Sequence, residues 1–370
     1  MRGKAAIFQG PGKGYEVREL EVPELEPEAM LIRVSMAGVC GSDLHFWRGD
    51  SPLFARMGGQ VGGHEMTGRV AALGANVKTD SLGQPLKEGD RVAYAYFRPC
   101  GRCYVCNQGQ AAACPNKTRG ITPADVFPHF TGAYAEYYYL RPGQWVFKVP
   151  DDLSDEIVAP VNCALSQVLY GLRRAGVKMG DTVVVQGAGG LGLNACAVAK
   201  EMGAERVIAL DGLPTRLELA KQFGADEVVD IREAATDKER VGRVMELTQG
   251  RGADVVGEFV GLPGVVPEGL QMVRPGGTYL EIGNISFGQT VALDPSALVW
   301  GSKTIVGVVM YESWVIPEAL DFLQRTRGRY PFDRTVSHRY AIEDINQAFS
   351  EAEWNREGAD TATTRAVITP

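Results

Sequence analysis

Short apolar runs, broken by Gly and Pro, fill the first 160 residues of the chain. Runs of four to eight residues that are rich in β-branched and aromatic side chains are typical of strands. Five such runs predict strands, at 4–8, 30–36, 67–73, 91–97 and 134–140. The first part of the chain is therefore expected to be mostly β.

The hydrophobic pattern changes after about residue 164. Apolar runs follow at 182–187, 206–211, 227–230, 253–260, 277–283 and 304–309. Segments with helical spacing lie between them, at 191–202, 214–223, 238–249 and 264–273. Buried-type strands that alternate with helices form parallel sheets with both faces covered. This part of the chain therefore predicts an α/β domain with a doubly wound parallel sheet.

The two patterns divide the chain into two domains. We expect residues 164–309 to form the α/β domain and residues 1–163 to form the β-rich one. After residue 310 the pattern is mixed again and ends in the apolar segment "RAVITP". Residues 310–370 are therefore expected to return to the β-rich domain.

Composition and charge narrow the possible partners. The chain has 370 residues, 45% hydrophobic and 22% charged, which is enough for two domains with separate cores. Its net charge is −7 and its longest basic run is Arg173–Arg174. Nucleic-acid-binding proteins usually carry a basic patch. We therefore expect no nucleic-acid partner.

The N-terminal segment and the cysteines bear on localisation. "MRGKAAIFQG" has no apolar stretch long enough for a signal peptide. The longest weakly polar run, 182–200, is interrupted by polar residues and glycines, so no membrane span is expected. Seven cysteines, an odd number, without an export signal indicate a reducing cytoplasm. Clustered cysteines there bind metal more often than they form disulfides.

A glycine-rich loop follows the first apolar run of the α/β domain. Gly187, Gly189 and Gly192 have the G-x-G-x-x-G spacing that lets a backbone approach a pyrophosphate at a helix N-terminus. Asp211, which ends the next predicted strand, could bind the ribose hydroxyls of NAD. The alternative is that Asp211 only caps the following helix. Arg216 could contact the ribose or a phosphate, so some use of NADP stays open.

Four cysteines lie within a lobe that spans residues 98–116. Cys100, Cys103, Cys106 and Cys114 have the spacing C-x2-C-x2-C-x7-C. Four thiolates make a closed tetrahedral zinc site with a structural role. The alternative is an iron–sulfur cluster, but the ferredoxin pattern has three residues before its last cysteine and this chain has seven. The spacing therefore favours zinc.

A second candidate metal site combines residues that are far apart in sequence. Cys40 lies in "VCGSDLH", His64 in "GGHEMTGRV" and Cys163 in "APVNCALSQ". A catalytic zinc has three protein ligands and one open position, and Asp43 could set the tautomer of His64. Taken singly, each has a simpler interpretation. A lone Cys is usually a small buried apolar residue, and a lone His before a Glu usually lies in a turn.

These motifs together resemble the zinc-dependent medium-chain alcohol dehydrogenases. The similarity runs from end to end, through "GVCGSDLH", "GGHEMTGRV", "GDRV", the four-cysteine lobe, "GAGGLG" and the segment of Arg365. The resemblance implies a GroES-like β-rich catalytic domain, completed by the C-terminal tail, and a Rossmann domain with a doubly wound parallel sheet.

The resemblance also implies the metal ligands. Cys40, His64 and Cys163 align with the ligands of a catalytic zinc, and Glu65 aligns with a carboxylate that can coordinate it transiently. The structural zinc ligands align with Cys100, Cys103, Cys106 and Cys114. One catalytic and one structural Zn²⁺ per chain are therefore expected.

The proton path and the cofactor site follow from the same resemblance. Ser42 aligns with the hydroxyl that takes the substrate proton, and His45 with the imidazole that passes it to solvent by way of the ribose; Asp43 is expected to support His64. The expected NAD contacts are Gly187, Gly189, Gly190, Leu191, Gly192, Asp211, Arg216, Val260, Ile282, Gly283 and Arg365. In related enzymes the substrate pocket is lined by segments that here hold Phe46, Trp47, Tyr96, Phe97, Phe130 and Tyr134. These aromatic residues could equally form the core of the β domain.

Two positions depart from what is common in the family. Gly41 stands where some members carry a basic residue that faces the cofactor phosphates, which suggests a weaker contact there. The third zinc ligand varies in the family between Cys, Asp and Glu. Because Asn162 precedes Cys163, the assignment of this ligand is the weakest of the three.

The expected function is a zinc-dependent transfer of hydride between an alcohol, bulky or secondary, and NAD, giving the aldehyde or ketone. The enzyme is expected to be a cytoplasmic homodimer or homotetramer. Alternatives are a polyol, sugar-alcohol or amino-alcohol dehydrogenase of the same family, or a zinc-independent quinone or enone reductase on the same fold. That last class is expected to lack the set Cys40, His64 and Cys163. If the protein were non-enzymatic and kept only the structural zinc, we would expect Ser42, His64 or the glycine loop to be replaced by other residues.

Overall fold

The computed structural model describes residues 1–51, 58–353 and 365–370. The chain forms two compact units. The first unit comprises Met1–Ser166, Met310–Arg327 and Phe332–Pro370. The second unit comprises Gln167–Val309 and Gly328–Pro331. Within the described residues, no helix combines the length and the apolar character needed to cross a membrane.

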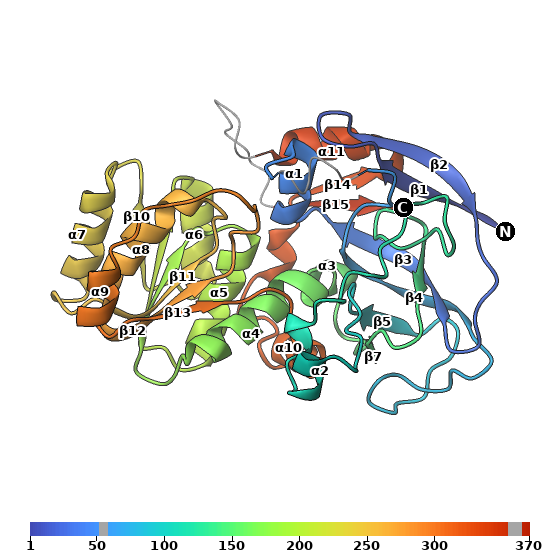
Figure 1. Ribbon diagram of the computed structural model, residues 1–370, viewed down its shortest axis with the longest axis horizontal. Coiled ribbons are helices and arrows are strands. Elements are labelled where there is room, and N and C mark those ends of the chain that lie inside the picture. The colour runs from blue at the N-terminus through green and yellow to red at the C-terminus, as the bar shows by residue number, and fades with distance from the viewer. Residues whose placement is uncertain (52–57, 354–364) are drawn as a thin grey trace. The chain divides into compact units, whose positions relative to one another are not determined.

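A six-stranded parallel sheet forms the centre of the second unit (Figure 1). Its strands lie in the order β10-β9-β8-β11-β12-β13. Their bounds are β8 Thr182–Gln186, β9 Arg206–Asp211, β10 Glu227–Asp230, β11 Ala253–Glu258, β12 Val273–Glu281 and β13 Thr304–Gly307. The order reverses at β8, as in dinucleotide-binding folds. The predicted doubly wound parallel sheet is confirmed.

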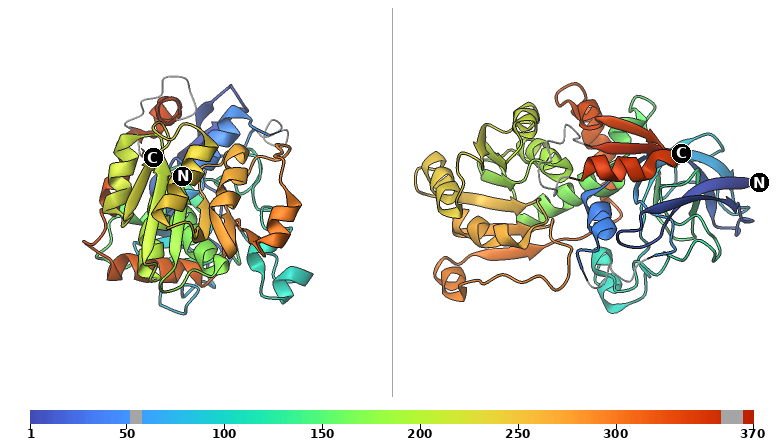
Figure 2. Two further views of the ribbon diagram at one scale, coloured as in Figure 1. Left: turned by 90° about the vertical axis from the view of Figure 1, so that its left-hand side faces the viewer. Right: turned by 90° about the horizontal axis from the view of Figure 1, so that it is seen from above.

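Helices cover this sheet on both faces (Figure 2). They are α4 Ser166–Ala175, α5 Gly190–Glu201, α6 Pro214–Gln222, α7 Asp237–Leu247, α8 Val266–Met272 and α9 Pro295–Trp300. Crossovers between parallel strands are right-handed, so the reversal at β8 puts α5 and α6 on the face opposite to α7 and α8. Val244 and Leu270 of the latter pair pack with Val184 and Val256 of the sheet.

The helix predicted at 264–273 is shorter than expected. A 3₁₀ turn occupies Pro263–Val265, and α8 ends at Met272. Val273 instead opens β12, because it pairs with Ala253 of the neighbouring strand. A strand partner that is distant in sequence decides this boundary.

The first unit contains a seven-stranded sheet and a two-stranded one (Figure 1). The larger sheet has the order β14-β15-β3-β4-β5-β7, and β6 pairs with β3. The bounds are β1 Arg2–Phe8, β2 Tyr15–Glu21, β3 Met30–Gly38, β4 Glu65–Leu73, β5 Arg91–Tyr94, β6 Tyr137–Leu140, β7 Val146–Lys148, β14 His338–Ala341 and β15 Ala366–Thr369. Strands β1 and β2 form the smaller antiparallel pair.

The C-terminal segment pairs with strands of the first unit. Strand β15 is antiparallel to β3, through the pairs Val367–Gly38 and Ile368–Ala37. The red C-terminal strands therefore lie beside the blue N-terminal ones (Figure 2). Short helices complete the unit: α1 Gly41–Arg48, α2 Tyr104–Asn107, α3 Asp155–Val158, α10 Val315–Arg325 and α11 Ile345–Ala352.

Candidate active site and cofactor-binding site

Helix α1 carries the segment "GSDLH", whose helical form the hydrophobic pattern did not predict. The helix begins after Cys40, which has an extended backbone and stands at the N-cap. The carboxylate of Asp43, at the third helical position, accepts a hydrogen bond from the Cys40 backbone N–H at 3.0 Å. This reciprocal arrangement is a capping box. It fixes Cys40 at the helix start, directly after β3.

Cys40, His64 and Cys163 come together in the first unit, although they are far apart in sequence. Their ligand atoms all lie within 4.8 Å of one another. The Cys40 and Cys163 sulfurs are 4.0 Å apart, far beyond the length of a disulfide bond. Two thiolates on one tetrahedral zinc would lie roughly 3.8 Å apart, given Zn–S bonds of about 2.3 Å. The donor set and its spacing therefore fit a zinc ion.

Asp43 fixes the orientation of the His64 ring. Its Oδ1 lies 3.1 Å from Nδ1 of His64, and its Oδ2 accepts the hydroxyl of Tyr134 at 2.7 Å. Burial opposes protonation of His64, but Asp43 and Cys40 raise its pKa well above the ordinary value. With Nδ1 held by a carboxylate, Nε2 is the nitrogen left for a metal.

Asn162, which made Cys163 the weakest assignment, faces away from the cluster. Its Nδ2 donates to the carbonyl oxygens of His64, at 3.1 Å, and Tyr94, at 2.9 Å. Its Oδ1 accepts the backbone N–H of Met66 at 3.2 Å. Both residues lie in a π-helical turn, Val161–Leu165, a geometry often found at functional sites. Asn162 therefore braces the backbone around His64, while Cys163 offers its sulfur to the cluster.

Glu65 and Arg365 form a buried ion pair beside the cluster. Glu65 is fully buried, and its Oε1 has no hydrogen-bond partner among the described residues. Burial raises the pKa of Glu65 to about 8, and Arg365 opposes this shift. A buried carboxylate oxygen without a partner is costly unless something fills its place. Arg365 was expected to contact pyrophosphate; the sequence had no signal for its pairing with Glu65.

Ser42 and His45 occupy different surroundings on α1. The Ser42 hydroxyl lies 3.3 Å from Nε2 of His64, at the cluster itself. His45 is buried, with its Nδ1 2.6 Å from Oδ2 of Asp50 and 3.1 Å from Nη2 of Arg48. Burial and then Arg48 lower the pKa of His45. His45 is therefore neutral at pH 7 and able to accept a proton.

Arg48 and Asp50 were not singled out from the sequence. Arg48 donates to both oxygens of Asp50, and through Nη1 to both carboxylate oxygens of Glu353 at 2.9 Å. Glu353 is more than 300 residues away in the chain. Arg48 and Asp50 are close to His45 in sequence, but no local pattern could have indicated that Glu353 holds Arg48.

The four-cysteine lobe also has the geometry of a metal site. The sulfurs of Cys100, Cys103, Cys106 and Cys114 lie within 4.8 Å of one another. The Cys103 sulfur is 3.4 Å from that of Cys106 and 3.9 Å from that of Cys114. Hydrogen bonds from the Arg102 backbone and the Asn116 side chain lower the pKa of Cys100 to about 5. Thiolates at these separations match the edges of a zinc tetrahedron.

The glycine loop of the second unit has no room for side chains at Gly187 and Gly192. A Cβ on Gly192 would lie 1.8 Å from the carbonyl oxygen of Gly187, and one on Gly187 would lie 2.8 Å from Val260. Gly187 has a φ of 89°, which other residues rarely adopt. Gly189 is the N-cap of helix α5, and Gly190 and Leu191 are the first two residues of that helix. The loop therefore exposes a helix N-terminus of the kind that binds pyrophosphate.

Asp211 ends β9 and faces this loop. Its Oδ2 accepts the backbone N–H of Ala188 at 2.8 Å, and its Oδ1 accepts that of Leu213 at 2.9 Å. Arg216 lies beside it, with Nη1 3.8 Å from Oδ2. The Nε of Arg216 has no partner among the described residues. The loop, the carboxylate and the guanidinium together fit a dinucleotide.

A buried carboxylate that the sequence did not single out holds the loops around the other predicted cofactor contacts. Glu258 ends β11, and its Oε1 accepts the backbone N–H groups of Val260 and Gly261 at 2.6 Å. Its Oε2 accepts that of Gly283 at 3.1 Å. Ile282 is buried beside it. A carboxylate at the end of a mostly apolar strand was the available signal.

The predicted substrate-pocket residues separate into two groups. Tyr96 lies at the metal cluster, with its ring 4.9 Å from that of His64, and Phe46 is half-buried on α1. Phe130 is instead fully buried in a hydrophobic cluster with Ile7 and Tyr137.

The remaining three aromatic residues pack inside the first unit. Phe97 is buried and packs against Tyr311. Tyr134 is buried, and Trp47 packs against the same cluster through Phe349. With Phe130, these residues contribute to the core of the first unit. Their assignment to the substrate pocket stays a prediction.

Comparison with known proteins identifies the family. Residues 26–151 match the "Alcohol dehydrogenase GroES-like domain" family, and residues 190–325 match the "Zinc-binding dehydrogenase" family. The chain is 34% identical to 5-exo-hydroxycamphor dehydrogenase of Pseudomonas putida, over 90% of this chain and 91% of the relative. It is 31% identical to sorbitol dehydrogenase of Bacillus subtilis, over 94% of this chain and 93% of the relative. It is 33% identical to L-threonine 3-dehydrogenase of Pyrococcus horikoshii, over 92% of each.

Solved structures agree with this result. An alcohol dehydrogenase from Thermotoga maritima matches all of both chains with a TM-score of 0.90 and 29% identity. A zinc-binding dehydrogenase from Sinorhizobium meliloti, bound to NADP, matches all of both chains with a TM-score of 0.83 and 26% identity. The fold, the two clusters and these relatives lead to one conclusion: the chain belongs to the zinc-dependent medium-chain alcohol dehydrogenase family.

Proposed function

We propose that the protein is a zinc-dependent, NAD-linked dehydrogenase that converts a secondary alcohol to a ketone. The cluster of Cys40, His64 and Cys163 carries the proposal, because a three-ligand site keeps a position open for a reacting oxygen. The four-cysteine lobe offers a closed site instead, to which we assign a structural zinc. A zinc-independent reductase on the same fold would have no need of the three-ligand cluster.

A zinc ion bound at this cluster would supply Lewis acidity that lowers the pKa of an alcohol. The residues around it would hold and move the proton. The Ser42 hydroxyl reaches Nε2 of His64, so it lies where a bound alcohol would give up its proton. His45, neutral at pH 7, is the residue to which we assign the next step. Tyr96 limits the site on the side of the His64 ring.

Asp211 supports NAD over NADP. Its carboxylate is held by two backbone N–H groups at the end of β9, the position from which a carboxylate binds ribose hydroxyls and repels a 2′-phosphate. Arg216 lies close enough to partly offset that repulsion, and a relative is known with NADP. We therefore propose a preference for NAD rather than strict selection.

The relatives act, by their names, on hydroxycamphor, sorbitol and L-threonine. Each of these compounds carries a secondary hydroxyl group. Because these different compounds share that group, they support a secondary alcohol as the substrate class, with polyols as the second candidate. Homo-oligomers in the cytoplasm remain our expectation for the assembly and its location.

Metal content and activity test the proposal together. Wild-type protein should hold about two zinc ions per chain. Cys163→Ser should lose about one zinc and at least a hundredfold in kcat/KM, because the open site loses a ligand. Cys103→Ser should also lose about one zinc, but with destabilisation as its main effect. Zinc is measured by mass spectrometry, and turnover with a panel of alcohols, with NAD and NADP supplied in parallel.

Cys196→Ser is the matched control, because Cys196 is a buried free cysteine of α5 outside both clusters. It should keep two zinc ions and full activity. Fully active wild-type protein with one zinc per chain would refute the catalytic-zinc proposal. Full activity of Cys163→Ser would favour a zinc-independent reductase instead.

A further inference from the structure

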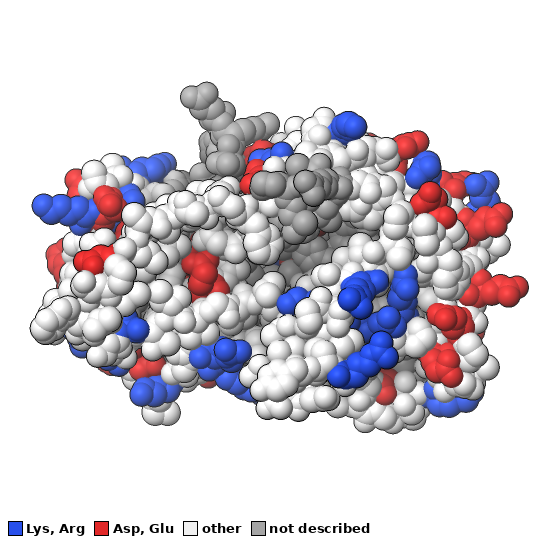
Figure 3. All heavy atoms as spheres, in the orientation of Figure 1, with Lys and Arg blue, Asp and Glu red and all other residues white. Residues whose placement is uncertain are grey.

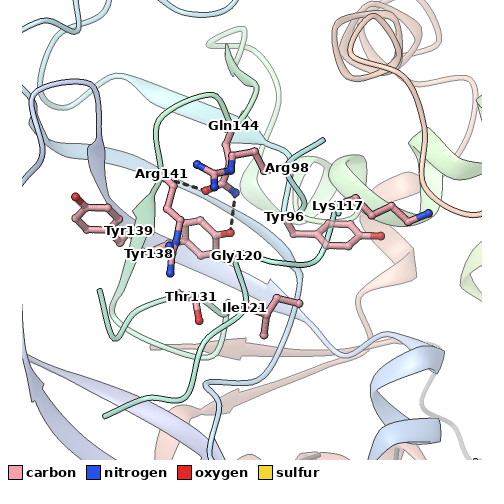
Figure 4. Close-up of a pocket in the computed structure, with 10 residues that line it drawn as sticks. All are labelled: Tyr96, Arg98, Lys117, Gly120, Ile121, Thr131, Tyr138, Tyr139, Arg141 and Gln144. Atoms are coloured by element: carbon pink, nitrogen blue, oxygen red, sulfur yellow. Dashed lines mark hydrogen bonds between the residues drawn. The ribbon is translucent and has the colours of Figure 1, made fainter. Parts of the chain in front are cut away.

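A small pocket in the first unit is lined by positive charge (Figure 4). Its cationic side chains are Arg98, Lys117 and Arg141. Arg98 follows β5, Lys117 follows the cysteine lobe and Arg141 follows β6. Three chain segments thus bring cations to one place in a protein of net charge −7. Figure 3 shows how unevenly Lys and Arg side chains are spread over the visible face.

None of the three cations has a carboxylate within salt-bridge distance among the residues that the structure describes. Each donates to a neutral oxygen instead. Arg98 donates to the carbonyl of Pro142 at 3.0 Å, and Arg141 to the hydroxyl of Thr122 at 3.3 Å. Lys117 donates to the carbonyl of Ala112 at 2.7 Å. These contacts hold the side chains in place without neutralising their charge.

Arg141 is the least compensated of the three. Its Nε is buried and has no hydrogen-bond partner in the described part of the chain. Burial and the neighbouring Arg98 lower its pKa. Half-buried cations close to one another are unfavourable without a counter-charge. Glu26 offsets part of the charge of Arg141, and Cys114 offsets part of that of Lys117. Neither of them lines the pocket, which therefore favours an anion.

The pocket borders the metal cluster. Tyr96 lines it, and the same ring lies 4.9 Å from the ring of His64. Across the pocket, Tyr138 is held through its hydroxyl by Gln144 at 3.0 Å, and Gln144 also accepts the Arg141 backbone N–H at 2.8 Å (Figure 4). Tyr96 is thus shared by the pocket and by the surroundings of the metal cluster, so the two sites are neighbours.

We propose that this pocket binds a compact anionic group, a carboxylate or a phosphate, carried by the alcohol substrate. This inference rests on the proposed function and narrows its substrate class to anionic alcohols. The small size of the pocket admits the charged group and not the whole substrate. Guanidinium groups suit this task, because they bind the paired oxygens of carboxylates and phosphates with charge-assisted hydrogen bonds.

Matched pairs of alcohols test the proposal. One pair is 4-(hydroxymethyl)benzoate and benzyl alcohol; the other is sorbitol 6-phosphate and sorbitol. Binding to the zinc-loaded protein with NADH is measured by calorimetry, and turnover is measured separately with NAD. The charged member of at least one pair should bind about tenfold tighter or more. Which pair shows the preference distinguishes a carboxylate from a phosphate substrate.

Variants locate the effect. Arg141→Gln should remove most of the preference for the charged member and leave binding of the neutral one within about twofold, while Arg141→Lys should restore part of it. Arg98→Gln serves as a second variant if Arg141→Gln does not fold. Arg119→Gln is the control, because Arg119 is an exposed arginine two residues after Lys117.

Two results would overturn the proposal. One is equal binding of charged and neutral members, and the other is a preference that survives both Arg141→Gln and Arg98→Gln. Binding of inorganic phosphate alone, with no preference for either charged alcohol, would also count against it. If the charged alcohols bind through Arg141 but none is oxidised, the proposed dehydrogenase function fails and the anion pocket stands.

Discussion

His45 shows how neighbours set the chemistry of a single residue. Burial and Arg48 lower its pKa, whereas the hydrogen bond to Asp50 raises it. Arg48 is itself held by Glu353, so its charge stays beside the imidazole. The balance favours the neutral imidazole of His45, the form that accepts a proton in the assigned relay.

We predict that Asp50→Asn shifts the acid limb of the kcat/KM profile to lower pH. Asp50 raises the pKa of His45, so its neutralisation lowers that pKa further. Activity that depends on neutral His45 is then retained to more acidic pH, and kcat/KM at pH 5 relative to pH 8 should rise about threefold or more. The profile is measured from pH 4.5 to 8.

Asp125→Asn is the control for this prediction, because Asp125 is an exposed carboxylate of the same unit. Its profile should coincide with that of the wild type. An acid limb at the same pH in Asp50→Asn and wild type would show that another group controls it, and would remove His45 from the proton path.

At the scale of elements, two neighbouring strands end in a pair of carboxyl groups. Glu258 of β11 and Glu281 of β12 are in register, and the Asn284 amide donates to both, at 3.2 and 2.9 Å. Burial and then Glu281 raise the pKa of Glu258 to about 8. Below about pH 8 the Glu258 carboxyl group is therefore mostly protonated. Tyr279 and Glu268 lie close by, and Arg240 is paired with Glu268.

We predict that Glu281→Gln stabilises the protein more at pH 9 than at pH 5. A raised carboxyl pKa in the folded state means that stability falls as the pH rises from 4.5 to about 8. The substitution would remove the repulsion between the two carboxylates and let the pKa of Glu258 fall. Each unit of that fall adds about 1.4 kcal/mol to the free energy of unfolding above pH 8.

The free energy of unfolding is measured by urea titration of the whole protein at both pH values. Glu227→Gln, at an exposed position of β10 in the same sheet, controls for loss of charge alone. A gain of equal size at pH 5 and pH 9 would show that Glu281 does not raise the pKa of Glu258.

At the scale of the whole molecule, strand β13 forms one edge of the parallel sheet, and α9 precedes it in the chain. Trp300 of α9 is 89% exposed, and Val299 and Ile305 are also exposed. Edge strands flanked by apolar side chains pair with other chains. A second copy of this chain is the partner that would extend the sheet symmetrically.

We predict that the protein dimerises through this edge. Trp300→Glu should then raise the dissociation constant of the dimer at least about tenfold, because a charge would be buried in the contact. Molar mass is followed by light scattering across a dilution series. Tyr104→Glu is the control, an exposed aromatic residue on the cysteine lobe. An unchanged mass for Trp300→Glu would place any interface elsewhere.

Local pattern accounts for much of the fold but not for all of it. The six strands of the parallel sheet follow from their apolar runs, because both faces of such a sheet are buried. Strand β2 was not predicted, since its alternating charged residues face solvent. Helix α1 was hidden as well, because capping by Cys40 and Asp43, not periodicity, defines it.

The sequence by itself determined which chemistry this protein can support. Cysteine spacing indicated the lobe, the glycine loop and Asp211 indicated a dinucleotide, and motif order indicated the family. These signals are local, so they survive without coordinates. Only the tertiary structure decided which groups face one another across long stretches of chain. Glu353 beside Arg48, Arg365 on Glu65 and the partly compensated Arg141 depend on folding, because burial and charge pairing arise between segments that sequence spacing does not connect.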